Sequence, residues 1–191
     1  MHLRRPALLL IVLGLLLGPG YYLYCEHLSG EEIGRYELRE RAERWTLADG
    51  SVQRFSGHLA YQPVVLELTP ERNDVRLRLA FHPAPDAVPG ENGYLATLFA
   101  FDHPLLQREL AVAVKAGSST SAAVATLPVH EPAGHVFVLE EVGRPASAIS
   151  HVTLTAYQGV ERLVASLAWG GVAMLLAGVV LLVYPAIARA R

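Results

Sequence analysis

The stretch that decides the fold is Leu163-Val-Ala-Ser-Leu-Ala-Trp-Gly-Gly-Val-Ala-Met-Leu-Leu-Ala-Gly-Val-Val-Leu-Leu-Val-Tyr-Pro-Ala-Ile-Ala188, which contains no charged side chain. As a helix, residues 163–184 alone would be about 33 Å long, enough to cross a bilayer's hydrocarbon core. Arg189 and Arg191 follow directly, as is typical of the cytoplasmic end of a membrane helix. We therefore predict a transmembrane helix over residues 163–188, followed by a basic cytoplasmic tail over residues 189–191.

A second apolar segment follows the basic residues Arg4 and Arg5, and it has two interpretations. As a signal peptide, Ala7–Leu17 would be the hydrophobic region, with small residues before a cleavage site. As an uncleaved membrane span, residues 6–24 are all apolar or aromatic and long enough to cross. We favour the span, with residues 1–5 as a basic cytoplasmic N-terminus.

The charge distribution predicts the orientation in the membrane. All 18 acidic residues lie between Glu26 and Glu161, whereas four of the 16 basic residues, Arg4, Arg5, Arg189 and Arg191, lie at the two ends of the chain. Basic ends around an acidic centre indicate two crossings with both termini in the cytoplasm. Arginine outnumbers lysine fifteen to one, and no Asn-x-Ser/Thr acceptor occurs. We expect a bacterial inner (plasma) membrane protein whose residues 26–161 are periplasmic or extracellular.

The middle of the chain has the patterns of short β-strands. Residues 74–81 alternate cleanly, with apolar residues facing inward and Arg76 and Arg78 outward. Residues 94–101 are apolar on both faces, as expected of a central strand. Further strands are predicted at 108–114, 121–127, 135–140 and 150–157. Regular spacing and turns rich in Pro and Gly predict one all-β antiparallel sandwich, either jelly-roll or immunoglobulin-like.

Two hairpins are predicted from turn residues. Residues 64–68 would pair with 74–81 across a turn at 70–73, and residues 45–47 with 51–55 across the turn at 48–50. The last strand ends only a few residues before Leu163. We therefore expect the sandwich to lie close to the bilayer.

Residues 29–44 are ambiguous between helix and strand. Ser29 and Glu32 fit a capping box, and charged residues at i,i+4 spacing would suit a helix. Tyr36, Leu38 and Ala42 also fit a strand. We expect a short helix near Ser29 that runs into a strand.

Small residues recur at helical spacing in both apolar segments. Gly14 and Gly18 form a small-xxx-small pair, and a second face of small residues comprises Ser166, Gly170, Ala173 and Ala177. Such faces allow close helix packing, so we predict helix-packing surfaces here, against each other or against a partner. Neither segment carries an internal acidic or basic residue of the kind that ion transport requires.

Catalytic and cofactor motifs are absent from the sequence. It has no nucleophile elbow, phosphate-binding loop or dinucleotide fingerprint. Six histidines lie in the middle region, and His130, Glu131 and His135 are weak candidates for metal ligands. No standard metal-binding spacing supports them. We therefore expect no cofactor, no metal and no enzymatic activity, nor any nucleic-acid partner.

The layout predicts a non-catalytic accessory subunit or assembly factor of a larger membrane complex. Its helices would dock on integral membrane partners within the lipid bilayer, and its sandwich would cap their outer face. The alternative is a membrane-anchored periplasmic module that binds or senses a ligand, either a carbohydrate or a metal. Layout alone does not distinguish these functions.

Overall fold

The computed structural model describes residues 4–46, 52–54, 58–101, 103–130 and 132–189. The chain divides into two compact units. One comprises residues 30–160, and the other comprises residues 1–29 together with 161–191.

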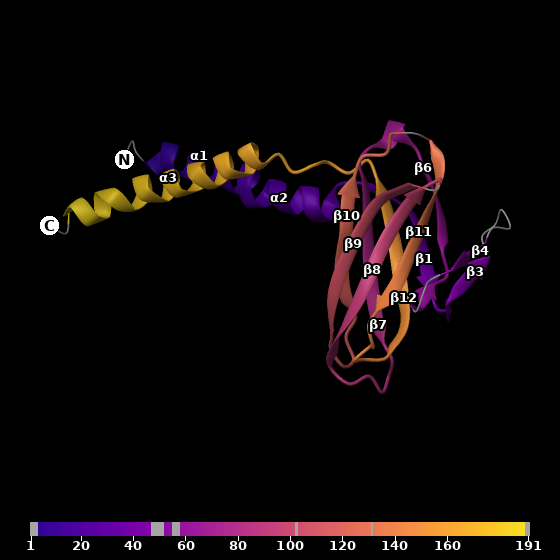
Figure 1. The fold of residues 1–191 in the computed structure, drawn as a ribbon. Helices are drawn as coiled ribbons and strands as arrows, with labels where there is room; N and C mark the ends of the chain where they lie inside the picture. The colour runs from indigo at the N-terminus through magenta and orange to yellow at the C-terminus, as the bar shows by residue number, and fades with distance from the viewer. Residues whose placement is uncertain (1–3, 47–51, 55–57, 102, 131, 190–191) are drawn as a thin grey trace. The chain divides into compact units, whose positions relative to one another are not determined.

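Residues 30–160 form a sandwich of two antiparallel sheets, which confirms the all-β prediction (Figure 1). One sheet has the order β1 (Glu31–Leu38), β12 (Ile149–Gln158), β7 (Val75–Pro83), β10 (Thr120–Leu127). The other has the order β2 (Arg41–Ala42), β5 (Ala60–Tyr61), β11 (Ala133–Val142), β8 (Gly90–Ala100), β9 (His103–Val114), with β6 (Val64–Leu68) also paired to β11. The predicted hairpin at 45–55 is present as β3 (Arg44–Thr46) and β4 (Val52–Arg54), and its turn lies outside the described residues.

The strand order is that of a jelly roll. Among the described residues, only β8 and β9 form a hairpin between consecutive long strands, and the other connections between long strands cross from one sheet to the other. The predicted hairpin of residues 64–68 with 74–81 is therefore wrong. The short 3₁₀ turn η3 (Pro70–Arg72) and its flanking residues carry the chain across the sandwich, so β6 pairs with β11 and β7 pairs with β12 and β10.

The core lies between the two sheets and follows the predicted alternation. Val75, Leu77, Leu79 and Phe81 are all fully buried, and they pack with apolar residues of β8, β11 and β12. The prediction fails for Arg76, which lies on the other face of β7 but is also buried.

No helix begins near Ser29, so that part of the prediction is wrong, whereas the predicted strand is present as β1 (Glu31–Leu38), followed by the short strand β2 (Arg41–Ala42). Ser29 ends the preceding helix instead, because its hydroxyl donates to the Cys25 carbonyl at 2.7 Å. A serine hydroxyl can accept a hydrogen bond from the first turn of a helix that follows it, or donate one to the last turn of a helix that precedes it. The sequence pattern at Ser29 does not distinguish these two roles.

One side of the sandwich is closed by an arginine. In β10 the pairing with β7 shifts register between Ala123 and Ala125, which leaves Val124 at a bulge. Arg108 of the edge strand β9 donates to the Val124 carbonyl at 2.6 Å. This hydrogen bond joins the neighbouring edges of the two sheets.

The second unit is a pair of long apolar helices. The first runs as α1 (Arg4–Leu15), η1 (Leu16–Gly20), α2 (Tyr21–Leu23) and η2 (Tyr24–Leu28), with wider π-helical turns around Pro19 and at its end. The second is α3 (Ala165–Arg189). Both are long and apolar enough to cross a membrane, over Arg5–Leu28 and Ala165–Tyr184. The first helix extends past the predicted end at Tyr24, so the sandwich begins at Gly30 rather than at residue 26.

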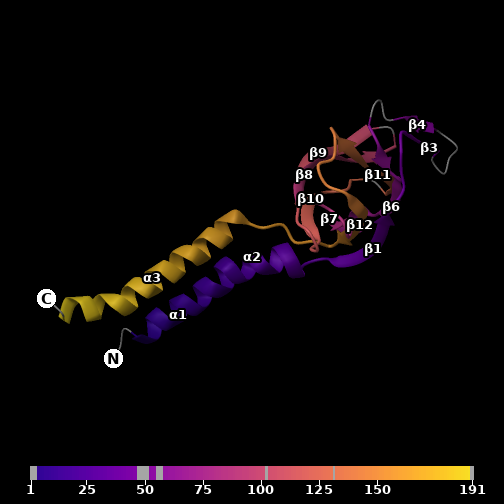
Figure 2. The same ribbon diagram turned by 90° about the horizontal axis from the view of Figure 1, so that it is seen from below.

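The two helices lie side by side and antiparallel (Figures 1 and 2). Their contact is made through glycines: a Cβ added at Gly14 would lie 2.7 Å from the Gly171 carbonyl, and one added at Gly178 would lie 2.8 Å from the Ala7 carbonyl. Gly18 also lies against Gly171 and Val172. The backbones therefore approach as closely as glycine alone allows.

The predicted small-residue face of α3 does not take part in this contact. Ser166, Ala173 and Ala177 are exposed within the described residues, and a Cβ added at Gly170 would meet nothing within 4 Å. Gly171 and Gly178, which are buried, take that role instead.

The glycine contact predicts opposite behaviour for two glycine-to-alanine variants. Gly14→Ala should push α1 from α3 and destabilise the helix pair by about 1–3 kcal/mol, because its Cβ would overlap α3 backbone atoms. Gly170→Ala, the matched control, should leave stability unchanged or slightly raised. Thermal unfolding of the full chain in detergent, followed by circular dichroism at the helix signal, would test this. Equal loss in both variants would contradict the packing.

Candidate functional site

A pocket of about 690 Å³ lies at the end of the sandwich where β11 finishes and β12 begins. Residues from three parts of the chain meet there: the link from β1 to β2, the segment before β5, and the β11–β12 connection. The lining residues are Arg39, Arg41, His58, Leu59, Glu141, Gly143, Arg144 and Pro145. We call this the Arg41–Glu141 pocket.

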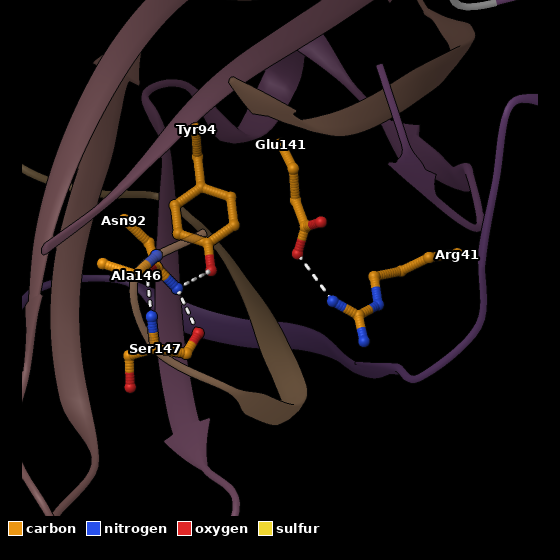
Figure 3. A network of polar contacts seen from close by, with 6 residues as sticks. All are labelled: Arg41, Asn92, Tyr94, Glu141, Ala146 and Ser147. Atoms are coloured by element: carbon orange, nitrogen blue, oxygen red, sulfur yellow. Dashed lines mark hydrogen bonds and ion pairs between the residues drawn. The ribbon is translucent and has the colours of Figure 1, made fainter. Parts of the chain in front are cut away.

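Two of the lining residues, Arg41 and Glu141, form an ion pair, whose side chains Figure 3 shows. Arg41 donates to the Glu141 carboxylate at 2.8 Å, and the Glu141 side chain is only 6% exposed. Burial opposes the charge of Arg41, but the hydrogen bond and negative charge of Glu141 outweigh it, so the pKa of Arg41 is raised. The guanidinium also lies 5.8 Å from the centre of the Tyr61 ring. Arg41 is therefore held in a fixed place and stays charged.

Two buried tyrosines lie beside this ion pair. Burial raises the pKa of both Tyr61 and Tyr94, so both hydroxyls stay neutral at physiological pH. The Tyr94 hydroxyl accepts a hydrogen bond from Asn92 at 3.2 Å. Among the described residues, the Tyr61 hydroxyl has no hydrogen-bond partner of ordinary geometry. Because both phenols are neutral, they add no second negative charge beside Glu141, and Glu141 remains the anion that pairs with Arg41.

Asn92 fixes the loop that forms one wall. Its side-chain oxygen accepts from the backbone N–H groups of Ala146 and Ser147, both at 2.9 Å, and its amide donates to the Ser147 carbonyl at 2.8 Å (Figure 3). Asn92 is almost fully buried. It therefore holds the β11–β12 connection, which carries Arg144, against β8.

The pocket has more positive than negative charge. Arg39 is paired with Glu37 at 2.7 Å, and Arg41 with Glu141. Arg144 is exposed and makes no ion pair with any residue that the structure describes. Guanidinium groups bind carboxylate and phosphate through paired hydrogen bonds. The lining is therefore suited to an anionic ligand.

The predicted metal residues lie at the opposite end of the sandwich. His130 and His135 line a second pocket of about 280 Å³ together with His103, while Glu131 lies outside the described residues. His135 is buried, whereas His103 and His130 are exposed. No group of three or more His, Cys, Asp or Glu residues within the described ranges is arranged to hold a metal.

Two further histidines stack on one another. The rings of His82 and His151 lie 4.2 Å apart and nearly parallel, and His82 shares a hydrogen bond with Thr153 at 3.2 Å. Burial and the neighbouring His82 lower the pKa of His151. Both residues lie in the four-stranded sheet, His82 in β7 and His151 in β12.

Sequence reasoning missed Arg41, Asn92 and Glu141 as site residues. Arg41 and Glu141 are a hundred residues apart, and nothing local to either indicates the partner. The available signal was a polar residue at an inward position of a strand, because such a residue needs a partner when buried. Asn92 and Glu141 both satisfy that description.

No model of a known protein family matches the chain, and no curated protein matches it. Among solved structures, it is similar to the C-terminal CBM6 of LamC, a marine laminarinase from Zobellia galactanivorans, with 13% identity and a TM-score of 0.36, over 64% of this chain and 99% of that one. It is also similar to the Podospora anserina GH26-CBM35 β-(1,4)-mannanase, with 17% identity and a TM-score of 0.35, over 71% of this chain but 27% of the other. A structure of infectious bursal disease virus, Gt strain, gives 12% identity and 0.31, over 70% of this chain and 35% of the other.

The hydrogen bonds between Asn92 and the β11–β12 connection predict different losses of stability for substitutions at Asn92 and at Ser147. Asn92→Ala should destabilise the sandwich by about 3 kcal/mol, because it leaves buried backbone groups of the β11–β12 connection without partners. Ser147→Ala should cost little or nothing, since the buried Ser147 hydroxyl has no hydrogen-bond partner among the described residues. Urea unfolding followed by the β-sheet signal would measure both. A loss in Ser147→Ala equal to that in Asn92→Ala would be inconsistent with this network.

Proposed function

We propose that this chain is a membrane-anchored, non-catalytic binding module whose Arg41–Glu141 pocket takes a small ligand bearing a carboxylate or phosphate group. The observation that carries the proposal is the pocket itself, which combines three arginines with one buried carboxylate. An acidic sugar and a phosphorylated small molecule share this chemistry.

The anchor in this proposal is the helix pair. Each helix has the length and hydropathy of a membrane span. Supporting evidence comes from the glycine contact, since close backbone packing is the main source of helix association in lipid. The charge distribution supports an orientation in which the arginine-bearing ends of both helices lie in the cytoplasm. The sandwich would then lie on the periplasmic or extracellular side of a bacterial plasma membrane.

Ligand binding would use the arginines unequally. Arg144 is free to turn toward a ligand, whereas Arg41 is already held by Glu141. An incoming anion would share Arg41 with the Glu141 carboxylate and would be repelled by it. Glu141 would therefore lower the affinity of the pocket for the anion, while its hydrogen bond keeps Arg41 in position.

Substitutions on either side of the ion pair should change anion binding in opposite directions. Arg41→Gln and Arg144→Gln should weaken binding about fivefold, and Glu141→Gln should strengthen it, because removing one charge contact or one repulsion is worth about 1 kcal/mol at a partly exposed site. Isothermal titration of the full chain in detergent, with inorganic phosphate, galacturonate and uncharged glucose as probes, would measure these effects.

The matched control is Arg72→Gln, an exposed arginine paired with Glu31 at the other end of the sandwich. It should leave binding unchanged. If glucose binds as well as galacturonate, or if Arg72→Gln acts like Arg41→Gln, the assignment of the pocket to anions fails.

A second candidate function is that of an accessory subunit or assembly factor. The specific observation in its favour is the small-residue face of α3, which the contact with α1 leaves uncovered at Gly170. In this version the face would dock on an integral membrane partner.

Gly170→Ile should then abolish co-purification of the partner, while Leu176→Ile, at an exposed position of the same helix, should retain it. Affinity purification from membranes at matched expression, followed by mass spectrometry, would compare the two variants. Retention by both would remove the basis for docking through this face.

A further inference from the structure

The two ends of the sandwich unit leave from the same corner as the tip of the β8–β9 hairpin. Glu31 lies opposite Gln158 in the β1–β12 pair, and Gln158 donates to the Thr69 carbonyl at the end of β6. In the other sheet Leu68 of β6 pairs with Ala133, and His135 two residues later pairs with Ala100. Gly30, Val160 and the hairpin tip at Phe101 therefore share one end of the sandwich, which we call the exit end.

The exit end exposes apolar side chains. Phe101 is 70% exposed and sits at a φ of 52°, a left-handed conformation that bulky residues rarely adopt. Leu105 on β9 is also exposed, and together with Pro128 these residues border a largely apolar pocket of about 280 Å³. A hairpin tip normally carries Asn, Asp or Gly. An exposed aromatic at a strained tip position points to a contact that the sandwich does not itself provide.

The connections to the apolar helices are short. Ser29 alone separates Gly30 from the helix that ends at Leu28, and residues 161–164 separate Val160 from α3 at Ala165. Fully extended, these connections reach at most about 7 Å and about 18 Å. The exit end is therefore the end of the sandwich at which both covalent connections to the helices begin.

We propose that the exit end rests on the lipid bilayer, with the side chain of Phe101 inserted at the interface between headgroups and acyl chains. The inference rests on the proposed membrane anchor and adds a second point of attachment to it. Aromatic side chains favour this layer, and Arg72 and Glu31 at the same end pair with one another at 3.3 Å. The Arg41–Glu141 pocket, at the opposite end, would then face away from the membrane.

The test uses labels placed at both ends of the full chain. In a Cys25→Ser background, single-cysteine variants Phe101→Cys and Leu105→Cys place an environment-sensitive fluorophore at the exit end. Val88→Cys is the control, because Val88 is 68% exposed in the β7–β8 connection at the opposite end. Each labelled protein is reconstituted into phosphatidylcholine vesicles that contain lipids with a quencher on the acyl chain.

We expect the quenching at positions 101 and 105 to be several-fold stronger than at position 88. Equal, weak quenching at all three positions would overturn the proposal. Alkaline carbonate extraction of the same vesicles separates this result from failure of the anchor: a chain that stays in the membrane with an unquenched label at 101 refutes only the contact of Phe101. A chain that is extracted refutes the anchor and the contact together.

Discussion

The pairing of β1 with β12 is the constraint on which the rest of the structure depends. Because the first and last strands of the sandwich are antiparallel neighbours, the chain enters and leaves at one corner. Asp74 and Val160 exchange backbone hydrogen bonds of 3.3 and 3.0 Å, which ties that corner to β7 as well. In the other unit the two helices are also antiparallel neighbours, and their glycines bring the backbones together.

In the Arg41–Glu141 pocket, the interactions that stabilise the fold also hold the side chains that the proposed ligand binding would use. A carboxylate as buried as that of Glu141 would be costly without Arg41, and a loop as polar as the β11–β12 connection would not stay in place without Asn92. The groups that satisfy these needs also determine where the exposed Arg144 can reach. Arg41 and Glu141 therefore hold one another, whereas Arg144 is exposed and makes no ion pair with a described residue.

Local patterns in the sequence predicted the strands but not their partners. The alternation over residues 74–81 was sufficient because one face of β7 is entirely buried. The turn residues at 70–73 did not predict the pairing of their flanking strands, because Pro, Glu and Asn suit both a hairpin and a crossing between sheets. Gly14 could be assigned to a packing face, yet Gly170 and Gly171 are adjacent, and only the position of the other helix distinguishes them. Arg41 and Glu141 are brought together by strands far apart in sequence, which no local pattern encodes.

The hydrogen bond from Arg108 to Val124 also affects whether copies of this protein can aggregate through the edges of their sheets. β9 and β10 are the edge strands on one side of the sandwich, and an unpaired edge is a template on which another chain can add a strand. The bulge at Val124 interrupts the regular ladder of backbone hydrogen bonds in β10, and the Arg108 guanidinium donates a hydrogen bond to the Val124 carbonyl. An incoming strand thus finds neither a regular row of acceptors nor an open gap. At the high local concentration of a crowded surface, this side of the sandwich would resist the edge-to-edge stacking that begins aggregation.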